Sequence, residues 1–468
     1  MRRMSRVVVL LLAVLAPPVA AQAGLSQADR TLAHDILRQL VEIVTTDSAG
    51  NTPQAAQAMA DRLIAAGFPA ADVRVFAVTP RVGTLVARLR GTDPALRPIL
   101  LLAHLDVVPA RREDWSVDPW TLLERDGWFY GRGTSDNKAG AATLVANLVR
   151  YQQEGWRPER DVIVALTGDE ETSGASIAGL LAQHRELVDA EFALNTDAGG
   201  ITLKAGRPTV FEVQASEKVY ADYGLEATDR GGHSSLPRPG NPIYTIAAAL
   251  GRIAHYEFPA HLDDVVRAFF ERSAQIESGQ LAADMRAVAR VPPDSGALAR
   301  LSASPVYNAQ LRTTCVATRA DAGHADNALP QRARAAVNCR ILPGESAADV
   351  EATLRSLAGD SVRLTVLSPP SEGPSSPPTA LVIGTLERVA RDQWPGIPVI
   401  PTMETGATDG RSVRRAGIPT YGVSAVAGDP NDVRAHGMDE RVGVQAYYDA
   451  TQFWYSMIKA FAGRRSGR

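Results

Sequence analysis

The sequence places histidine and acidic side chains directly after three apolar runs. The runs span residues 99–103, 162–166 and 192–194, and they are followed by His104 and Asp106, by Glu170 and Glu171, and by Asp197. Buried parallel strands have such continuous apolar runs, and open α/β sheets bind ligands at the carboxyl ends of their strands. We therefore expect these imidazole and carboxylate groups to meet at one edge of a sheet.

Asp136 and His436 are two further candidate ligands. Asp136 precedes a predicted helix, residues 139–151, and lies among glycines that allow tight backbone paths. Its carboxylate can either cap that helix or bridge two cations. Two imidazoles and three carboxylates suit zinc, with manganese or cobalt as substitutes, and one shared aspartate predicts a two-metal site with positions left open for water. The predicted ligands are His104, Asp136, Glu171, Asp197 and His436.

The neighbouring acids Glu170 and Glu171 can take different roles, because adjacent residues in an extended segment point in opposite directions. Glu171 can bind metal while Glu170 faces a bound water as general base, and Asp106 can orient the His104 ring. Each fragment alone is ordinary, since a His-x-Asp is usually surface decoration and consecutive acids are usually a solvated turn. Their joint placement at successive strand ends indicates catalysis.

Apolar periodicity predicts the elements that position these residues. Helical spacing over residues 27–44, followed by buried strands alternating with helices, indicates an α/β catalytic domain with a mostly parallel central sheet flanked by helices. It is interrupted by strand–helix–strand–strand–helix–strand order, typical of an inserted α+β (ferredoxin-like) lid. The expected order is a signal peptide at 1–23, a first catalytic segment at 24–212, the lid or dimerisation domain at 213–367, a proline- and serine-rich linker at 368–378, and a second catalytic segment at 379–468.

Composition narrows the class of protein. The net charge of −3, with 45% hydrophobic and 22% charged residues, is typical of a globular protein, and no basic cluster interleaved with aromatics supports nucleic-acid binding. An arginine-rich start, an apolar stretch at 7–16 and alanines at 20, 21 and 23 predict a signal peptide, a periplasmic or secreted location, and no membrane span after its removal. Cys315 and Cys339 can form a disulfide or remain two buried thiols.

Several segments together resemble the co-catalytic di-zinc metallopeptidase family of carboxypeptidases, aminoacylases, acetylornithine deacetylase and succinyl-diaminopimelate desuccinylase. The matching segments are residues 103–109, 130–138, 169–171, 197–200 and 232–234, and His436. The similarity is greatest to carboxypeptidase S and the secreted N-acyl-amino-acid hydrolases, and it covers nearly the whole chain after residue 23. It implies that Asp136 bridges two zinc ions, completed by His104 and Asp197 on one side and by Glu171 and His436 on the other. It also implies that Glu170 activates a metal-bridging water and later protonates the leaving amine.

The same resemblance assigns roles to residues of the lid. His233, in residues 230–235, is implied to polarise the scissile carbonyl and stabilise the oxyanion, often across a dimer interface. Asn327 and Arg340 match lid positions that hold substrate. A guanidinium fits a C-terminal carboxylate, so Arg340 is a candidate clamp; a surface salt bridge is the alternative. The resemblance also implies a homodimer formed through the lid.

Two departures from the family pattern bear on the substrate. Position 197 is Asp where several deacylases have Glu, which favours a carboxypeptidase or dipeptidase. The loop 405–411 departs from the familiar Gly-Gly-Thr-Asp-Ala-Arg, which leaves the substrate-binding role of Arg411 open. The expected function is an exported zinc metallopeptidase or amidohydrolase acting on small peptides or N-acyl amino acids. The alternatives are a biosynthetic deacylase, which the signal peptide disfavours, and a non-catalytic binding module, which the intact ligand set disfavours.

Overall fold

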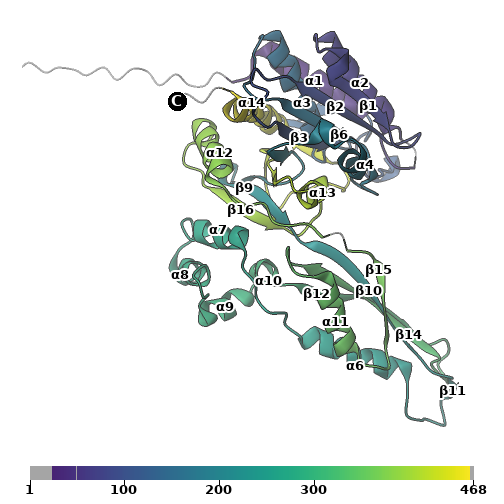
Figure 1. Cartoon of the computed structure of the whole chain (residues 1–468). Helices are drawn as coiled ribbons and strands as arrows, with labels where there is room; N and C mark the ends of the chain where they lie inside the picture. The colour runs from purple at the N-terminus through teal and green to yellow at the C-terminus, as the bar shows by residue number, and fades with distance from the viewer. Residues whose placement is uncertain (1–23, 49, 371, 464–468) are drawn as a thin grey trace, which may run out of the picture.

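The computed structural model describes residues 24–48, 50–370 and 372–463. Within them the chain forms a large α/β region and a smaller α+β region that extends away from it (Figure 1). The predicted signal peptide lies outside the described residues. In the described ranges, no helix combines the length and the apolar character needed to cross a membrane.

The large sheet is parallel at its centre, as predicted. Its strands are β1 Val73–Ala77, β2 Gly83–Leu89, β3 Ile99–His104, β6 Val162–Thr167, β7 Phe192–Asn195, β8 Gly200–Lys204, β9 Arg207–Glu217, β16 Val399–Glu404, β17 Thr420–Gly422 and β18 Ala427–Gly428. The order is β1-β2-β6-β3-β7-β17-β9-β8-β18, and β16 also pairs with β9. The run β6-β3-β7-β17 is parallel throughout, so its carboxyl ends face the same edge.

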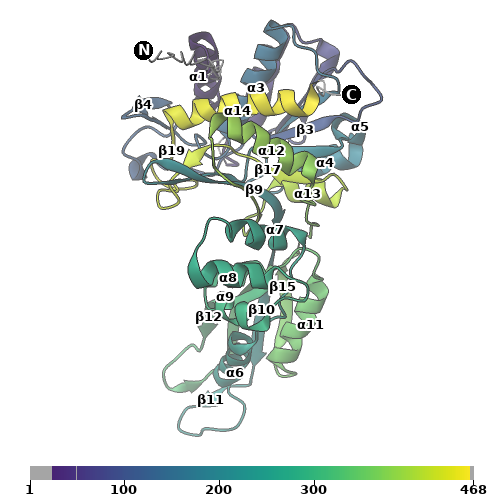
Figure 2. The same cartoon turned by 90° about the vertical axis from the view of Figure 1, so that its left-hand side faces the viewer.

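Helices cover both faces of this sheet (Figure 2). One face carries α1 Gln27–Glu42, α2 Thr52–Ala65, α3 Lys138–Gln153, α12 Ala380–Gln393 and α14 Val444–Ala462, and the other carries α4 Ala175–Gln183, α5 Arg185–Val188 and α13 Asp409–Arg415. Along β3, Leu101 packs into the first core and Leu100 and Leu102 pack into the second. Burial on both faces explains why this strand is apolar at every position before His104.

The smaller region is the ferredoxin-like lid. Its elements in chain order are β10 Val219–Thr228, α6 Pro242–His255, β12 Thr314–Ala322, β14 Arg332–Ile341, α11 Ala347–Ala358 and β15 Arg363–Ser368. The strands form an antiparallel sheet of order β12-β14-β10-β15, and α6 and α11 bury one face of it. Cys315 and Cys339 are cross-strand neighbours on β12 and β14 and form a disulfide.

Short elements complete both regions. The remaining short strands are β4 Leu123–Arg125, β5 Trp128–Tyr130 and β19 Arg441–Gly443, which form one small sheet, and β11 Gly232–His233 and β13 Ala328–Leu329, which pair with each other; the 3-10 turns are η1 Ala70–Asp72 and η2 Arg112–Asp114. The β11–β13 pair lies at the end of the lid farthest from the large sheet in both views (Figures 1 and 2).

A helical insertion joins the lid to the large sheet. It consists of α7 Asp264–Ser273, α8 Gly279–Val288, α9 Ser295–Ser302 and α10 Pro305–Leu311. Phe270 of α7 shares an apolar cluster with Met403 of β16, so the insertion packs against the large sheet. Because β9 belongs to the large sheet and β10 to the small one, we infer that the lid domain begins at Lys218 and ends at Ser368.

Candidate active site

Three predicted ligands meet at the carboxyl edge of the large sheet. His104 is the last residue of β3, and Asp197 follows the adjacent parallel strand β7. His104 Nε2 lies 2.9 Å from Asp136 Oδ1 and 3.4 Å from Asp197 Oδ1. Ligand atoms around a tetrahedral zinc ion, each about 2.1 Å from it, are separated by about 3.4 Å. His104 therefore lies at a distance from each of these two carboxylates that suits shared ligation of a divalent cation. The groups whose ligand atoms all lie within 4.8 Å of one another are His104 with Asp136 and Glu171, and His104 with Glu170 and Asp197.

The other two predicted ligands approach the second oxygen of the same aspartate. His436 Nε2 lies 3.1 Å from Asp136 Oδ2 and 3.0 Å from Glu171 Oε1. Asp136 does not cap α3, because that helix begins after Asn137 and no side-chain cap is formed there. Its two carboxylate oxygens instead face two different imidazoles. This arrangement is what a carboxylate shared by two cations requires.

The paired acids after β6 face different partners, although they lie in a turn and not in the extended segment assumed from the sequence. Glu171 contacts His436, whereas the carboxylate of Glu170 groups with His104 and Asp197, with ligand atoms all within 4.8 Å of one another. The carboxylate of Asp106 accepts hydrogen bonds from the backbone N–H groups of Glu170 (3.1 Å) and Glu171 (2.9 Å). Asp106 therefore holds the backbone of both acids, and its carboxylate also lies next to the His104 ring.

His104 is fixed from its far side. Its Nδ1 lies 3.0 Å from the backbone carbonyl oxygen of Asp106 and 3.5 Å from a carboxylate oxygen of the same residue. A proton on Nδ1 satisfies these acceptors and leaves Nε2 free to bind a cation. Asn137 performs a similar task for Asp197, since its Nδ2 donates to Asp197 Oδ1 at 3.2 Å while its oxygen accepts from Thr196 at 2.6 Å.

The pKa shifts of the acids in the cluster indicate that it has too little positive charge to keep all of its carboxylates ionised. Burial raises the pKa of Glu170, and the nearby charges of Asp197, Asp409 and Glu171 add to the rise against the opposing charge of His104. Burial also raises the pKa of Asp197. Burial opposes the ionisation of Asp136, but hydrogen bonds to the two imidazoles hold the pKa of that carboxyl below its usual range. Divalent cations would supply the missing positive charge.

Two buried acids near the site were not predicted from the sequence. Asp409, at the start of α13, accepts a hydrogen bond from Thr167 Oγ1 at 2.6 Å, and burial raises its pKa to about 7. Glu440 is fully buried beneath the loop that carries Asp136 and accepts hydrogen bonds from it. The sequence shows only that an acid is present in the loop 405–411 and in the segment around His436. It does not show that either acid is buried, because the contacts of both acids join residues far apart in the chain.

The lid residues that were predicted to contact substrate lie at two separate ends of the lid. His233 lies on β11 and pairs with Ala328, and the backbone oxygen of Asn327 accepts from Ser234 at 3.0 Å. His233 and Asn327 are both exposed, at the far end of the lid from the metal-ligand cluster. The chain therefore does not bring them to its own cluster in this conformation.

Arg340 lies at the inner end of the lid, on β14, and Arg411 lies in α13 of the large region. Arg340 Nη1 donates to the carbonyl oxygen of Thr405 at 2.6 Å, and its guanidinium stacks 4.7 Å from the ring of Tyr220. Thr405 follows β16 in the segment that leads to Asp409. Arg411, in α13, is half-buried, and its Nε is enclosed without a hydrogen-bond partner among the described residues.

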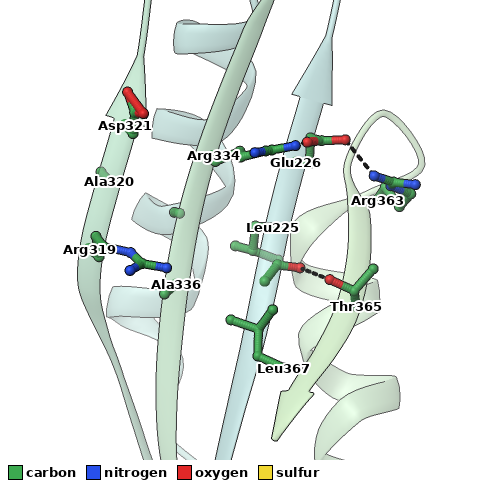
Figure 3. A pocket seen from close by; sticks show the side chains of 12 residues that line it. Leu225, Glu226, Arg319, Ala320, Asp321, Arg334, Ala336, Arg363, Thr365 and Leu367 are labelled. Carbon is green, nitrogen blue, oxygen red and sulfur yellow. Dashed lines mark hydrogen bonds and ion pairs between the residues drawn. The ribbon is translucent and has the colours of Figure 1, made fainter.

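Two hollows differ in what they offer a ligand. A hollow of about 480 Å³ lies on the open face of the lid sheet, where Glu226 pairs with Arg334 and Arg363 (Figure 3). It contains none of the predicted ligands. A second, of about 60 Å³, lies against Asp106 and Glu171 and extends to Thr45 and Arg81. Only the second adjoins the metal-ligand cluster.

An α/β sheet with a ferredoxin-like lid and a carboxylate shared between two imidazole sites defines a metal-dependent hydrolase. Comparison with known proteins agrees, because residues 100–460 match the profile of peptidase family M20/M25/M40. The chain belongs to this family.

Relatives within the family include both N-acyl-amino-acid hydrolases and carboxypeptidases. The chain is 30% identical to N-fatty-acyl-amino acid synthase/hydrolase PM20D1 of Mus musculus over 385 residues, 79% of this chain and 75% of that protein. It is 28% identical to probable carboxypeptidase S-like 2 of Dictyostelium discoideum over 397 residues, 80% of this chain and 74% of that protein. The M20 metallo-carboxypeptidase Sso-CP2 from Sulfolobus solfataricus has the same fold, with a TM-score of 0.67, 16% identity, and coverage of 92% and 99% of the two chains.

Proposed function

We propose that the protein is an exported two-zinc hydrolase, with manganese or cobalt as substitute ions, that cleaves the amide bond of small peptides or N-acyl amino acids. The observation that carries this proposal is the placement of Asp136, whose two oxygens face His104 and His436 separately. Support comes from the family, whose members similar to this chain are named for fatty-acyl-amino-acid and carboxypeptidase activities.

Glu170 is the proposed proton carrier. The metal ions would lower the pKa of water towards about 7 and polarise the scissile carbonyl. Glu170 lies near His104 and Asp197 but is not one of the five proposed ligands, so in this proposal its carboxylate takes a proton from the attacking water. Burial raises the pKa of Glu170 in the metal-free chain, and the positive charge of bound metal ions would oppose that rise. His104, oriented by Asp106, and Glu171, held by the same carboxylate, maintain the geometry.

Arg340 is the proposed recognition group for a substrate carboxylate. Its contact with Thr405 places it where the lid meets the catalytic domain, beside the segment that leads to Asp409. A guanidinium has five donors in a planar fork, so one bond to Thr405 leaves others for a carboxylate. Both proposed substrate classes, peptides with a free C-terminus and N-acyl amino acids, carry that group. Asn327 and Arg411 remain proposed substrate contacts.

His233 requires a second chain if it is to act on the reaction. It lies at the far end of the lid from the cluster of its own chain, and Asn327 lies beside it. We propose a homodimer in which the lid of one chain supplies His233 to the carbonyl of a substrate held by the other. An exposed imidazole is free to donate a hydrogen bond to a developing oxyanion there.

A release assay on a defined panel tests the function. Dipeptides and N-acyl amino acids are each supplied with a free and with an amidated carboxyl group, and the purified protein is assayed before chelation, after chelation, and after zinc is returned. We expect turnover to depend on the metal and to favour free carboxylates, and Arg340→Ala to remove that preference. Activity that survives chelation contradicts the metal mechanism, and equal rates on blocked substrates contradict the Arg340 clamp.

A further inference from the structure

Glu440 is a buried acid whose carboxylate accepts several hydrogen bonds, and it is not itself a proposed metal ligand. Its side chain is fully buried. One carboxylate oxygen accepts from the backbone N–H of Gly133 at 3.0 Å, and the other accepts from the N–H groups of Ser135 at 2.8 Å and Asp136 at 3.0 Å. The Ser135 hydroxyl donates to it as well, at 2.9 Å. The conformation of the loop that presents Asp136 is therefore set by the Glu440 side chain.

Arg132 links that loop to the segment that carries His436. Its Nη1 donates to Glu440 at 2.7 Å, and both side chains are buried. Its Nη2 faces the carbonyl oxygens of Gly437 at 3.1 Å and His436 at 3.5 Å. The guanidinium also rests 5.0 Å from the ring of Trp115. One buried ion pair thus contacts the backbone of both the bridging ligand and the last ligand.

The two proposed metal positions differ in how much they need such support. His104 ends β3 and Asp197 follows β7, so their backbones are held by the sheet. His436 lies between β18 and β19, outside any helix or strand, with 53% of its side chain exposed and a left-handed φ of 63°. A non-glycine residue in that backbone region is disfavoured unless its surroundings hold it. The position formed by Asp136, Glu171 and His436 is therefore the weaker one.

We propose that Glu440 and Arg132 are positioning residues that create the second metal position by holding His436 and Asp136 in register. This inference rests on the proposed two-metal function. A purely structural role predicts something different, because a buried ion pair that only stabilises the fold affects both metal positions alike when it is broken. A positioning role predicts selective loss of the position that depends on the loop.

Metal titration of the Glu440→Gln variant separates these roles. Metal-free wild type and variant are titrated with Zn²⁺ by calorimetry, and with Co²⁺ while its visible absorption reports ligand geometry. We expect the second ion to bind about 10- to 100-fold more weakly, the usual cost of removing a group that orients a ligand. The first ion should lose less affinity, because it shares only Asp136 with the second and its other two proposed ligands follow strands of the large sheet. Two wild-type binding steps would overturn the proposal.

The chain offers a closely matched control in Glu217. Glu217 is also buried, pairs with buried Arg414 at 2.7 Å, and accepts from the backbone N–H and hydroxyl of Thr408 at 2.8 Å, but none of these partners carries a proposed metal ligand. Glu217→Gln should lower the unfolding temperature and leave both binding steps intact. If the two variants lose the second step equally, general destabilisation explains the loss and the clamp is wrong.

A milder variant keeps the test open if Glu440→Gln does not fold. Arg132→Lys retains the buried charge but gives up the forked contacts to the carbonyls of His436 and Gly437. It should weaken the second step by less than Glu440→Gln does, with the Co²⁺ spectrum of the first ion unchanged. Wild-type affinity for both ions in this variant contradicts the clamp. A wild-type chain that takes up a single ion contradicts the two-metal function itself, and the clamp with it.

Discussion

The metal-ligand cluster and the tip of the lid differ in their burial and in how their side chains are held. The cluster is assembled within one chain from the ends of adjacent strands, is mostly enclosed, and contains acids with shifted pKa values. The lid tip holds His233 on a two-residue strand, exposed, at the other end of the molecule (Figure 1). Groups that share an ion must be held rigidly close together, whereas a group that only meets the substrate can arrive from another chain. The difference predicts that binding and proton transfer are complete in one chain and oxyanion stabilisation is not.

The largest expected effect comes from the proton carrier inside the cluster. Glu170→Gln should lower kcat by about 10²–10⁴-fold, the usual contribution of a positioned general base, while two metal ions remain bound. Elemental analysis with single-turnover kinetics measures both quantities. The matched variant is Glu171→Gln, which should lose an ion as well as activity. If the two variants behave alike, the division of roles between the neighbouring acids is wrong.

The next effect concerns the lid tip and tests the comparison directly. His233→Ala should reduce kcat by about 10²–10³-fold, as expected for the loss of an oxyanion donor, whereas His324→Ala, another exposed lid histidine, should have no effect. Mixing inactive Glu170→Gln and His233→Ala chains should restore about one quarter of wild-type activity, because half of the dimers then contain one complete site. If subunit exchange is confirmed and activity is still not restored, action of His233 between chains is ruled out.

The smallest effect is a pH dependence of stability in the metal-free protein. Burial raises the pKa of Asp409 to about 7 in the folded chain, against about 3.9 when unfolded. The folded state therefore binds this proton more tightly, and stability is lost as the pH rises from about 4 through 7. Asp409→Asn removes this loss and should gain about 1–2 kcal/mol on wild type between pH 5 and pH 8. Urea unfolding of both proteins at a series of pH values measures this gain in the free energy of unfolding. A difference between the two proteins that does not change with pH contradicts the prediction.

The sequence predicted the sheet, the lid and the members of the cluster for the same local reason. Apolar runs such as residues 99–103 identify buried strands, and strand ends of a parallel sheet share one edge, so His104 and Asp197 had to be neighbours. Arg340 and His233 carried no comparable signal, because alternating strands of an antiparallel lid show which face is buried but not how far the lid projects. Sequence periodicity therefore did not separate the two lid residues, which the structure places at opposite ends.

Glu440 shows a second limit of sequence reasoning. It lies in a motif around His436, yet the groups that it holds, Gly133 to Asp136, are more than 300 residues away in the chain. An acid in a polar motif is usually solvated, and only tertiary packing makes this one a buried acceptor. The pairing of Cys315 with Cys339 was similarly undecided until the register of β12 and β14 made them neighbours.

The sequence by itself determined the family and the fold class and predicted the ligand types, because these follow from short-range patterns and from the chemistry of histidine and carboxylate side chains. The tertiary structure alone decided that the two oxygens of Asp136 face different imidazoles, that His233 is remote from its own cluster, and that one buried ion pair contacts the backbone of both Asp136 and His436. Each of these depends on distances between segments far apart in the chain, which periodicity and spacing do not encode.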